Sequence, residues 1–188
     1  MASWLGVDVG GARKGFDCAL VQERRLAGLW AGLDREAVLD IVERDRPEIV
    51  AIDGPCRCAP RGHTSREDER RLNRAICGIR WTPDEHEVGA NPYYGWVVEG
   101  LRLYEALERR GVPAIEVFPT ASWTRWLGPR RNRSRAAWTT AGLAALPLDG
   151  LPARSNQDVR DAIAAAVTAR AHTRNLTEMF GEIVVPRR

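Results

Sequence analysis

The stretch that decides the fold is Ser-Trp-Leu-Gly-Val-Asp-Val over residues 3–9, followed by Gly-Gly-Ala-Arg-Lys-Gly over residues 10–15. A short apolar run that ends in an acid and then in glycines predicts a strand followed by a tight turn. Two further runs of small and apolar residues, 16–21 and 25–31, follow with a polar turn between them. The three runs predict an antiparallel meander at the start of the fold.

After the meander the pattern alternates between helix and strand. From Asp34 the apolar residues recur with helical spacing, and residues 48–53 (Glu-Ile-Val-Ala-Ile-Asp) form a buried strand that ends in a second acid. The later elements are expected to be a helix over 94–110, a strand over 112–119 that Pro119 closes and an alanine-rich helix over 157–172. The order predicts an α/β fold with a five-stranded mixed sheet, three antiparallel strands and then β-α-β crossovers, flanked by helices.

Length and composition are typical of one globular domain over residues 1–188, with 44% hydrophobic and 28% charged residues. Residues 56–90 are arginine-rich and irregular, and we expect them to form an insertion over the sheet edge with a short helix over 65–75. The chain has no apolar run long enough for a membrane span and no secretory start, so we expect a cytoplasmic protein. A formal charge of +3 is too mild to establish a polyanionic partner.

Acids stand where strands end and on the closing helix. Asp8 and Asp53 end strands that this order makes parallel neighbours, so both side chains should open on one edge of the sheet. Asp158 and Asp161 are three residues apart and therefore share a helix face, while Glu116 lies inside the fifth strand. Clustered carboxylates repel one another until a cation neutralises them, and oxygen ligands favour Mg²⁺ or Mn²⁺. All five acids are candidate catalytic residues, and the four aspartates are candidate metal ligands.

Each acid also has a purely structural interpretation. Asp8 and Asp53 both precede glycine and could serve turns, and Asp158 could cap its helix. Glu116 could point to solvent or pair with an arginine. Asp161 lies deeper in the helix among alanines, where capping no longer explains an acid.

A basic segment over residues 123–135 contains two tryptophans, five arginines and no acid. This composition suits stacking on bases and contacts to phosphates, although it also fits a solvated surface over two core tryptophans. The candidate nucleic-acid-binding residues are Lys14, Trp123, Arg125, Arg130, Arg131 and Arg133. The alternative of a zinc site is disfavoured, because the cysteines at 56, 58 and 77 and His63 miss the usual ligand spacing.

Four short motifs now support a resemblance. They are Gly6-Val7-Asp8-Val9-Gly10, Ile52-Asp53-Gly54-Pro55, Glu116-Val117-Phe118-Pro119 and Asp158-Val159-Arg160-Asp161-Ala162. In this order they resemble a family of predicted ribonuclease H-like nucleases long treated as a domain of unknown function, and the last also looks like the closing helix of Holliday-junction resolvases.

The resemblance implies a ribonuclease H-like fold and hydrolysis of DNA or RNA phosphodiester bonds by two-metal catalysis. It implies that Asp8, Asp53 and Asp161 are metal ligands, with Asp158 or Glu116 completing the site. The resolvases carry glutamate where this chain has Asp53, which is a shorter side chain.

Two other functions are compatible with the sequence. The Gly6–Gly11 stretch also looks like the first phosphate hairpin of ATP-handling phosphotransferases of the sugar-kinase and actin type, but the chain is short for that group and has no second glycine-rich loop. The other alternative is a catalytically silent ribonuclease H-like binding domain. A homodimer is compatible with all three functions.

Overall fold

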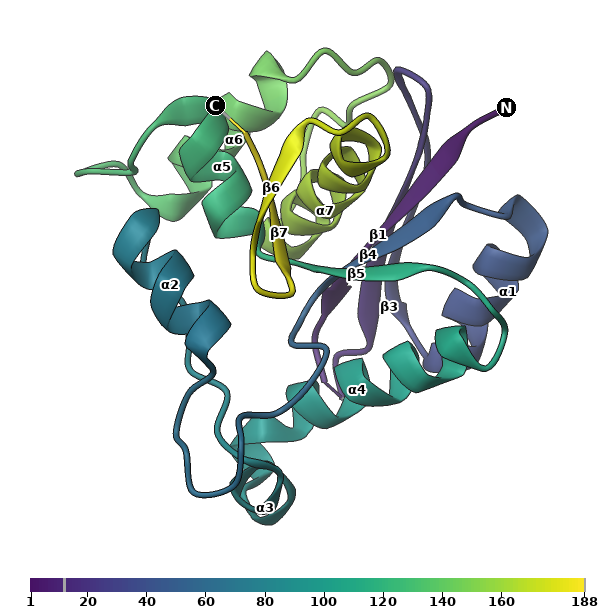
Figure 1. The fold of residues 1–188 in the computed structure, drawn as a ribbon. Helices are drawn as coiled ribbons and strands as arrows, with labels where there is room; N and C mark the ends of the chain where they lie inside the picture. The colour runs from purple at the N-terminus through teal and green to yellow at the C-terminus, as the bar shows by residue number, and fades with distance from the viewer. Residues whose placement is uncertain (12, 188) are drawn as a thin grey trace.

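The protein is built on one mixed sheet of seven strands in the order β3-β2-β1-β4-β5-β7-β6, in a computed structural model that describes residues 1–11 and 13–187 (Figure 1). The strands are β1 (Ser3–Val9), β2 (Phe16–Gln22), β3 (Arg25–Leu33), β4 (Ile49–Asp53), β5 (Ala114–Val117), β6 (Thr177–Phe180) and β7 (Ile183–Pro186). The first three form the expected antiparallel meander, and β4 and β5 follow parallel to β1. The α/β class and the mixed sheet are confirmed.

The prediction of five strands is wrong, because a C-terminal hairpin adds two. Strands β6 and β7 form an antiparallel hairpin that turns at Gly181, and β7 pairs in parallel with β5. Both strands have only four residues. Apolar segments as short as these form strands only because they pair with the edge of an existing sheet. The local sequence does not reveal that pairing.

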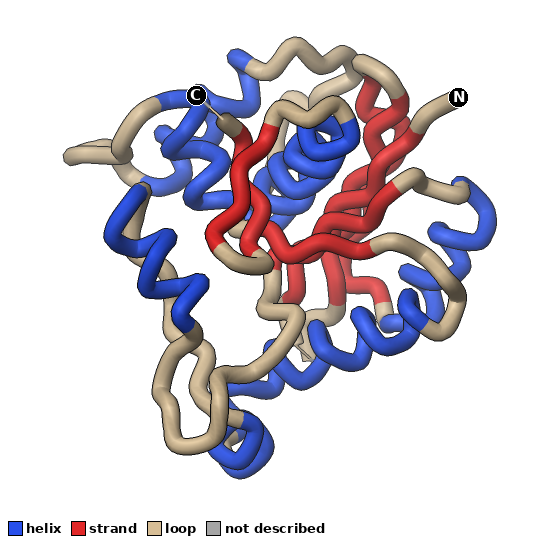
Figure 2. Tube along the Cα trace, viewed as in Figure 1, coloured by secondary structure: helices blue, strands red, loops and turns tan. Residues whose placement is uncertain are grey.

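Helices cover both faces of the sheet (Figures 1 and 2). They are α1 (Arg35–Asp45), α2 (Glu67–Ala75), α3 (Glu85–Ala90), the 3₁₀ turn η1 (Pro92–Tyr94), α4 (Gly95–Glu108), α5 (Pro119–Leu127), α6 (Arg135–Ala145) and α7 (Gln157–Thr173). Helices α1 and α4 pack on one face, and α7 packs on the other with α5 and α6. Within the described part of the chain, no helix has the length and apolar character that a membrane crossing needs.

Strand alternation decides which side chains meet α7. In β1, Trp4 belongs to the core cluster under α7, whereas Leu5 and Val7 belong to the cluster under α1 and α4. Because side chains alternate along a strand, Asp8 faces α7 with Trp4. In β4 the same alternation puts Asp53 on the α7 face, two residues after Ala51.

The alanine-rich helix α7 lies directly on the backbone of β1. A Cβ atom added at Gly6 would lie 2.0 Å from the carbonyl oxygen of Ala162 and 2.3 Å from the amide nitrogen of Ala166. Only glycine on the strand and small residues on the helix permit such an approach. The contact brings the N-terminal half of α7 to the end of β1.

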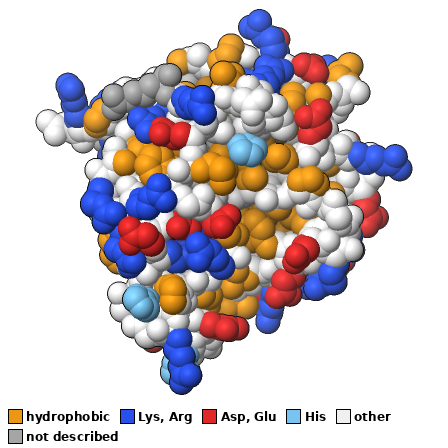
Figure 3. Space-filling view, viewed as in Figure 1, with side chains coloured by type: hydrophobic (Ala, Val, Ile, Leu, Met, Phe, Trp, Pro, Cys, Tyr) orange, Lys and Arg blue, Asp and Glu red, His pale blue; other side chains and the backbone are white. Residues whose placement is uncertain are grey.

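The segment over residues 56–90 packs against the C-terminal hairpin. Asp68 on α2 accepts a hydrogen bond from the backbone amide of Glu182 at 3.3 Å and pairs with Arg57 at 2.9 Å. Figure 3 shows acidic and basic side chains intermixed over this region, in agreement with the ion pairs around α2. Most charged side chains of α2 are paired with one another or with neighbouring arginines.

Candidate metal centre

Three carboxylates meet at the end of the central strands. Asp8 and Asp53 are directly paired across the parallel β1–β4 ladder, and α7 adds Asp161 from above the sheet. One oxygen from each of the three side chains lies within 4.8 Å of the other two. Among the described residues this is the one group of His, Cys, Asp and Glu side chains close enough to share a metal ion. We refer to Asp8, Asp53 and Asp161 as the carboxylate trio.

Burial and mutual repulsion make ionisation of the trio unfavourable. Burial, and then the Asp161 and Asp158 carboxylates, raise the pKa of Asp8 to about 7. Burial followed by repulsion from Asp8 and Asp161 raises the pKa of Asp53 well above its ordinary value. A bound cation would remove this conflict, since it favours the charged form of every ligand.

Asp161 is held in place by three neighbours. Its Oδ1 accepts hydrogen bonds from Nε1 of Trp123 at 3.1 Å and from Nε2 of Gln157 at 3.0 Å, and its Oδ2 accepts one from Arg135 at 2.8 Å. Burial still raises the pKa of Asp161, although Arg135 and the two hydrogen-bond donors oppose that rise. The orientation of this carboxylate is therefore fixed.

Asp158 lies beside the trio rather than in it. It forms an ion pair with Lys14 at 2.7 Å, and both side chains are partly exposed. The capping interpretation of Asp158 is wrong, because the N-cap of α7 is Asn156, whose side chain accepts a hydrogen bond from the amide of Val159 at 2.8 Å. Asp158 does lie in the first turn of α7, where an acid is favoured by the helix dipole.

Glu116 is separated from the trio by the alternation of β5. Its neighbours Ile115 and Val117 pack toward α7, so Glu116 projects to the other side of the sheet. There it accepts two hydrogen bonds from Arg66, one of them at 2.7 Å, and one from the amide of Cys56 at 3.0 Å. Arg66 and Glu116 are almost fully buried. Their ion pair ties the 56–90 segment to the sheet, and the structure does not group Glu116 with the acids that sequence analysis joined to it.

The candidate nucleic-acid-binding residues divide into buried and exposed groups. Trp123 is fully buried and donates to Asp161, so its expected role in stacking on bases is wrong. Arg125 is mostly buried and pairs with Glu178. The exposed residues are Lys14 and the three arginines of the loop between α5 and α6, Arg130, Arg131 and Arg133.

A cleft of about 690 Å³ opens at the trio and extends to the 56–90 segment. Six carboxylates and four basic side chains line it, which leaves a formal charge of −2. The acids are Asp8, Asp53, Glu69, Glu116, Asp158 and Asp161, and the bases are Lys14, Arg66, Arg80 and Arg135. One divalent cation would balance this charge, and an oxygen-only donor set suits Mg²⁺ or Mn²⁺.

Sequence analysis missed three residues of this site. Gln157 precedes Asp161 by one helical turn, a spacing that could have indicated the contact. Asp17 stands opposite Asp8 in the β1–β2 ladder, and its charge contributes to the raised pKa of Asp8. Arg135 belongs to the basic segment over residues 123–135, but nothing in the sequence indicated its contact with Asp161, which depends on the packing of α6 against α7.

The sheet order, the helix packed across the first strand and the acids at the strand ends define an α/β fold with a mixed sheet and an acidic centre at one edge. The solved structures that the chain resembles include Thermus thermophilus RuvC, with 16% sequence identity, a TM-score of 0.54 and coverage of 92% of this chain and 96% of RuvC. T. thermophilus RuvC in complex with a Holliday-junction substrate matches with 16% identity, a TM-score of 0.54 and coverage of 93% and 96%. At this identity the likeness shows the fold alone. No protein-family model matches the chain, and no curated protein matches it.

Proposed function

We propose that the chain is a divalent-metal-dependent nuclease that hydrolyses phosphodiester bonds of nucleic acid. The observation that carries the proposal is the carboxylate trio, in which three acids from separate parts of the chain converge although burial and repulsion oppose their ionisation. The fold shared with RuvC, one structure of which contains a Holliday-junction substrate, supports nucleic acid as the substrate class.

Asp8, Asp53 and Asp161 would hold the cation. When bound, Mg²⁺ or Mn²⁺ supplies charge stabilisation for phosphodiester hydrolysis and makes water a stronger nucleophile. Gln157 and Trp123 keep the Asp161 carboxylate aimed at the trio through their hydrogen bonds. Lys14, which lines the cleft, and the exposed Arg130, Arg131 and Arg133 of the loop between α5 and α6 would hold the phosphate backbone.

The same observation argues against a catalytically silent binding domain. A protein that needs no cation gains nothing from three partly or fully buried acids that raise the pKa of one another, because that arrangement destabilises the folded state.

A cleavage panel tests the proposal. The purified protein is incubated with Mg²⁺, Mn²⁺ or EDTA and with single-stranded, duplex and four-way-junction DNA and with single-stranded RNA. We expect cleavage of at least one substrate that depends on the metal and falls at least about a hundredfold in Asp8→Asn and in Asp161→Asn, because each substitution removes a charged ligand.

Asp40→Asn is the matched control, since Asp40 is an exposed acid on α1 outside the cleft. This variant should cleave like the wild type. Cleavage that survives in Asp8→Asn, or a wild type that binds Mn²⁺ and cleaves none of the substrates, would contradict the proposal.

A further inference from the structure

We propose that Arg135 acts as a movable counter-ion that pairs with Asp161 in the metal-free protein and passes to a phosphate of the nucleic acid when a cation occupies the trio. This makes Arg135 a substrate-positioning residue. The inference rests on the proposed function, and it goes beyond the basic composition of the 123–135 segment by assigning to Arg135 a contact that changes when the metal ion binds.

The pairing joins a buried acid to an exposed base. Nη2 of Arg135 lies 2.8 Å from Oδ2 of Asp161, and the acid is 2% exposed whereas the arginine side chain is 47% exposed. Because about half of the Arg135 side chain is exposed to solvent and it belongs to none of the hydrophobic core clusters, it can leave Asp161 without disturbing the core. Oδ2 would then be available to a metal ion.

Arg135 is the basic residue that touches the trio directly. Lys14, the other exposed base at this end of the cleft, is paired at 2.7 Å with Asp158, which lies outside the trio. Arg66 is occupied by Glu116 and Glu69, and Arg80, the remaining base of the cleft, forms no ion pair with the trio in the described part of the chain. Among the described residues, the competition between a basic side chain and a cation for a trio oxygen therefore centres on Arg135.

The position of Arg135 also suits a phosphate. It is the first residue of α6, next to the N-cap Ser134, where the helix dipole favours anions. It directly follows the exposed loop that carries Arg130, Arg131 and Arg133. A guanidinium released from Asp161 would thus be free to bind a phosphate at the cleft, one residue beyond this arginine-bearing loop.

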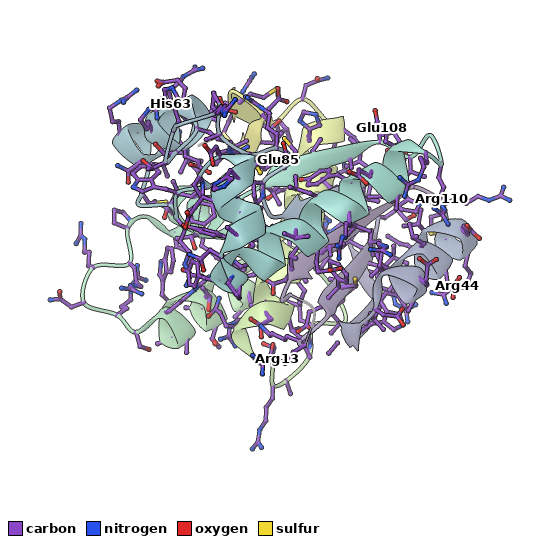
Figure 4. The ribbon with its side chains drawn as sticks, turned by 90° about the horizontal axis from the view of Figure 1, so that it is seen from below. Arg13, Arg44, His63, Glu85, Glu108 and Arg110 are labelled. Carbon is purple, nitrogen blue, oxygen red and sulfur yellow. The ribbon has the colours of Figure 1, made fainter. Side chains whose placement is uncertain are left out.

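The first test measures metal affinity without nucleic acid, by calorimetric titration of the full chain with Mn²⁺. Arg135→Gln removes the competing charge, so we expect Mn²⁺ to bind about tenfold more tightly than in the wild type. Arg110→Gln is the matched control, because Arg110 forms an ion pair with Glu43 at 3.2 Å just beyond the far end of α4 (Figure 4). Its Mn²⁺ affinity should equal that of the wild type.

The second test measures binding of a four-way DNA junction in Ca²⁺ as a function of salt. We expect Arg135→Gln to bind the junction more weakly and to lower the slope of log K against log salt by about one, because one phosphate contact is lost. Arg135→Lys keeps the charge and should restore most of the slope. Tighter binding of metal together with weaker binding of nucleic acid is a combination that a merely structural arginine does not produce.

The outcomes separate the two proposals. A wild type that binds no Mn²⁺ overturns the proposed function and this inference together. A wild type that binds Mn²⁺ and cleaves, beside an Arg135→Gln variant whose metal affinity is unchanged, overturns the inference alone. If Arg135→Gln binds Mn²⁺ more tightly but its slope of log K against log salt for the DNA junction is unchanged, Arg135 does not bind a phosphate and that part of the inference is wrong.

Discussion

Asp8 makes the stability of the metal-free protein depend on pH. Its pKa is about 7 in the folded protein and about 3.8 in the unfolded chain. Below pH 3.8 both states are protonated and the folded state is not penalised. As the pH rises toward 7, the unfolded chain ionises first, so stability is lost. In EDTA we expect the free energy of unfolding to fall by about 2 kcal/mol between pH 5 and pH 7, since one pKa unit corresponds to about 1.4 kcal/mol.

Urea unfolding at a series of pH values measures this effect. Asp8→Asn should reduce the dependence, with a remainder of the same sign from the raised pKa of Asp53. Mn²⁺ should reverse the dependence, because metal binding requires ionised carboxylates. A metal-free wild type that becomes more stable from pH 5 to pH 7 would contradict the raised pKa of Asp8.

Glu116 is predicted to stabilise the fold and not to bind metal. Glu116→Gln leaves the buried guanidinium of Arg66 with only Glu69 as its charged partner, so we expect a loss of about 3 kcal/mol in the free energy of unfolding. Mn²⁺ affinity should stay within about twofold of the wild type, because Glu116 lies outside the trio. If Glu116→Gln bound Mn²⁺ more weakly but kept the stability of the wild type, Glu116 would be a metal ligand and the prediction would be wrong.

The sequence predicted residues of the site whose position follows from strand ends. Asp8 and Asp53 each follow an apolar run, and the strand order alone brings them to one edge. The sequence could not show that Glu116 and Asp161 lie on different faces of the sheet, because this depends on which face of β5 packs against α7. The sequence also left open whether Trp123 stacks on bases or lies in the core, and only its burial decides for the core.

At the scale of the elements, the contact between β1 and α7 sets the geometry of the trio. Gly6→Ala would place a methyl group 2.0 Å from the carbonyl oxygen of Ala162, so strand and helix must separate. We expect a loss of about 3 kcal/mol in the free energy of unfolding and at least about tenfold weaker Mn²⁺ binding, since Asp161 moves away from Asp8.

Gly89→Ala provides the comparison, because Gly89 lies on α3 and a Cβ atom there meets nothing within 4 Å. Its stability and Mn²⁺ affinity should match those of the wild type or rise slightly, as expected for alanine in a helix. Equal Mn²⁺ affinity in Gly6→Ala and Gly89→Ala would show that the trio does not depend on this contact.

Elements with a strong local pattern were predictable, and elements defined by their neighbours were not. The meander, α1, β4, α4, β5 and α7 follow from periodicity and from turn residues. Helix α5 was not predicted, because Pro119 was interpreted as the end of a strand. In the structure Pro119 lies in the first turn of the helix. Strand β7 exists as a strand because it pairs with β5, which no local pattern reveals.

At the scale of the whole molecule, metal binding and folding should be coupled. Because the trio is formed only in the folded chain, Mn²⁺ at about one hundred times its dissociation constant should add about 2.7 kcal/mol to the free energy of unfolding. Asp53→Asn should remove most of this gain, whereas Asp40→Asn should keep it. Thermal unfolding with and without Mn²⁺ measures both, and an equal gain in the two variants would place the bound ion elsewhere.

The backbone contact at Gly6 has one more consequence. With main chain against main chain, the spacing between the first strand and the last helix does not depend on how large the surrounding side chains are. Core residues farther along either element can exchange one apolar side chain for another while the two acids keep their separation. The geometry of the carboxylate trio therefore tolerates ordinary substitutions among the apolar core residues.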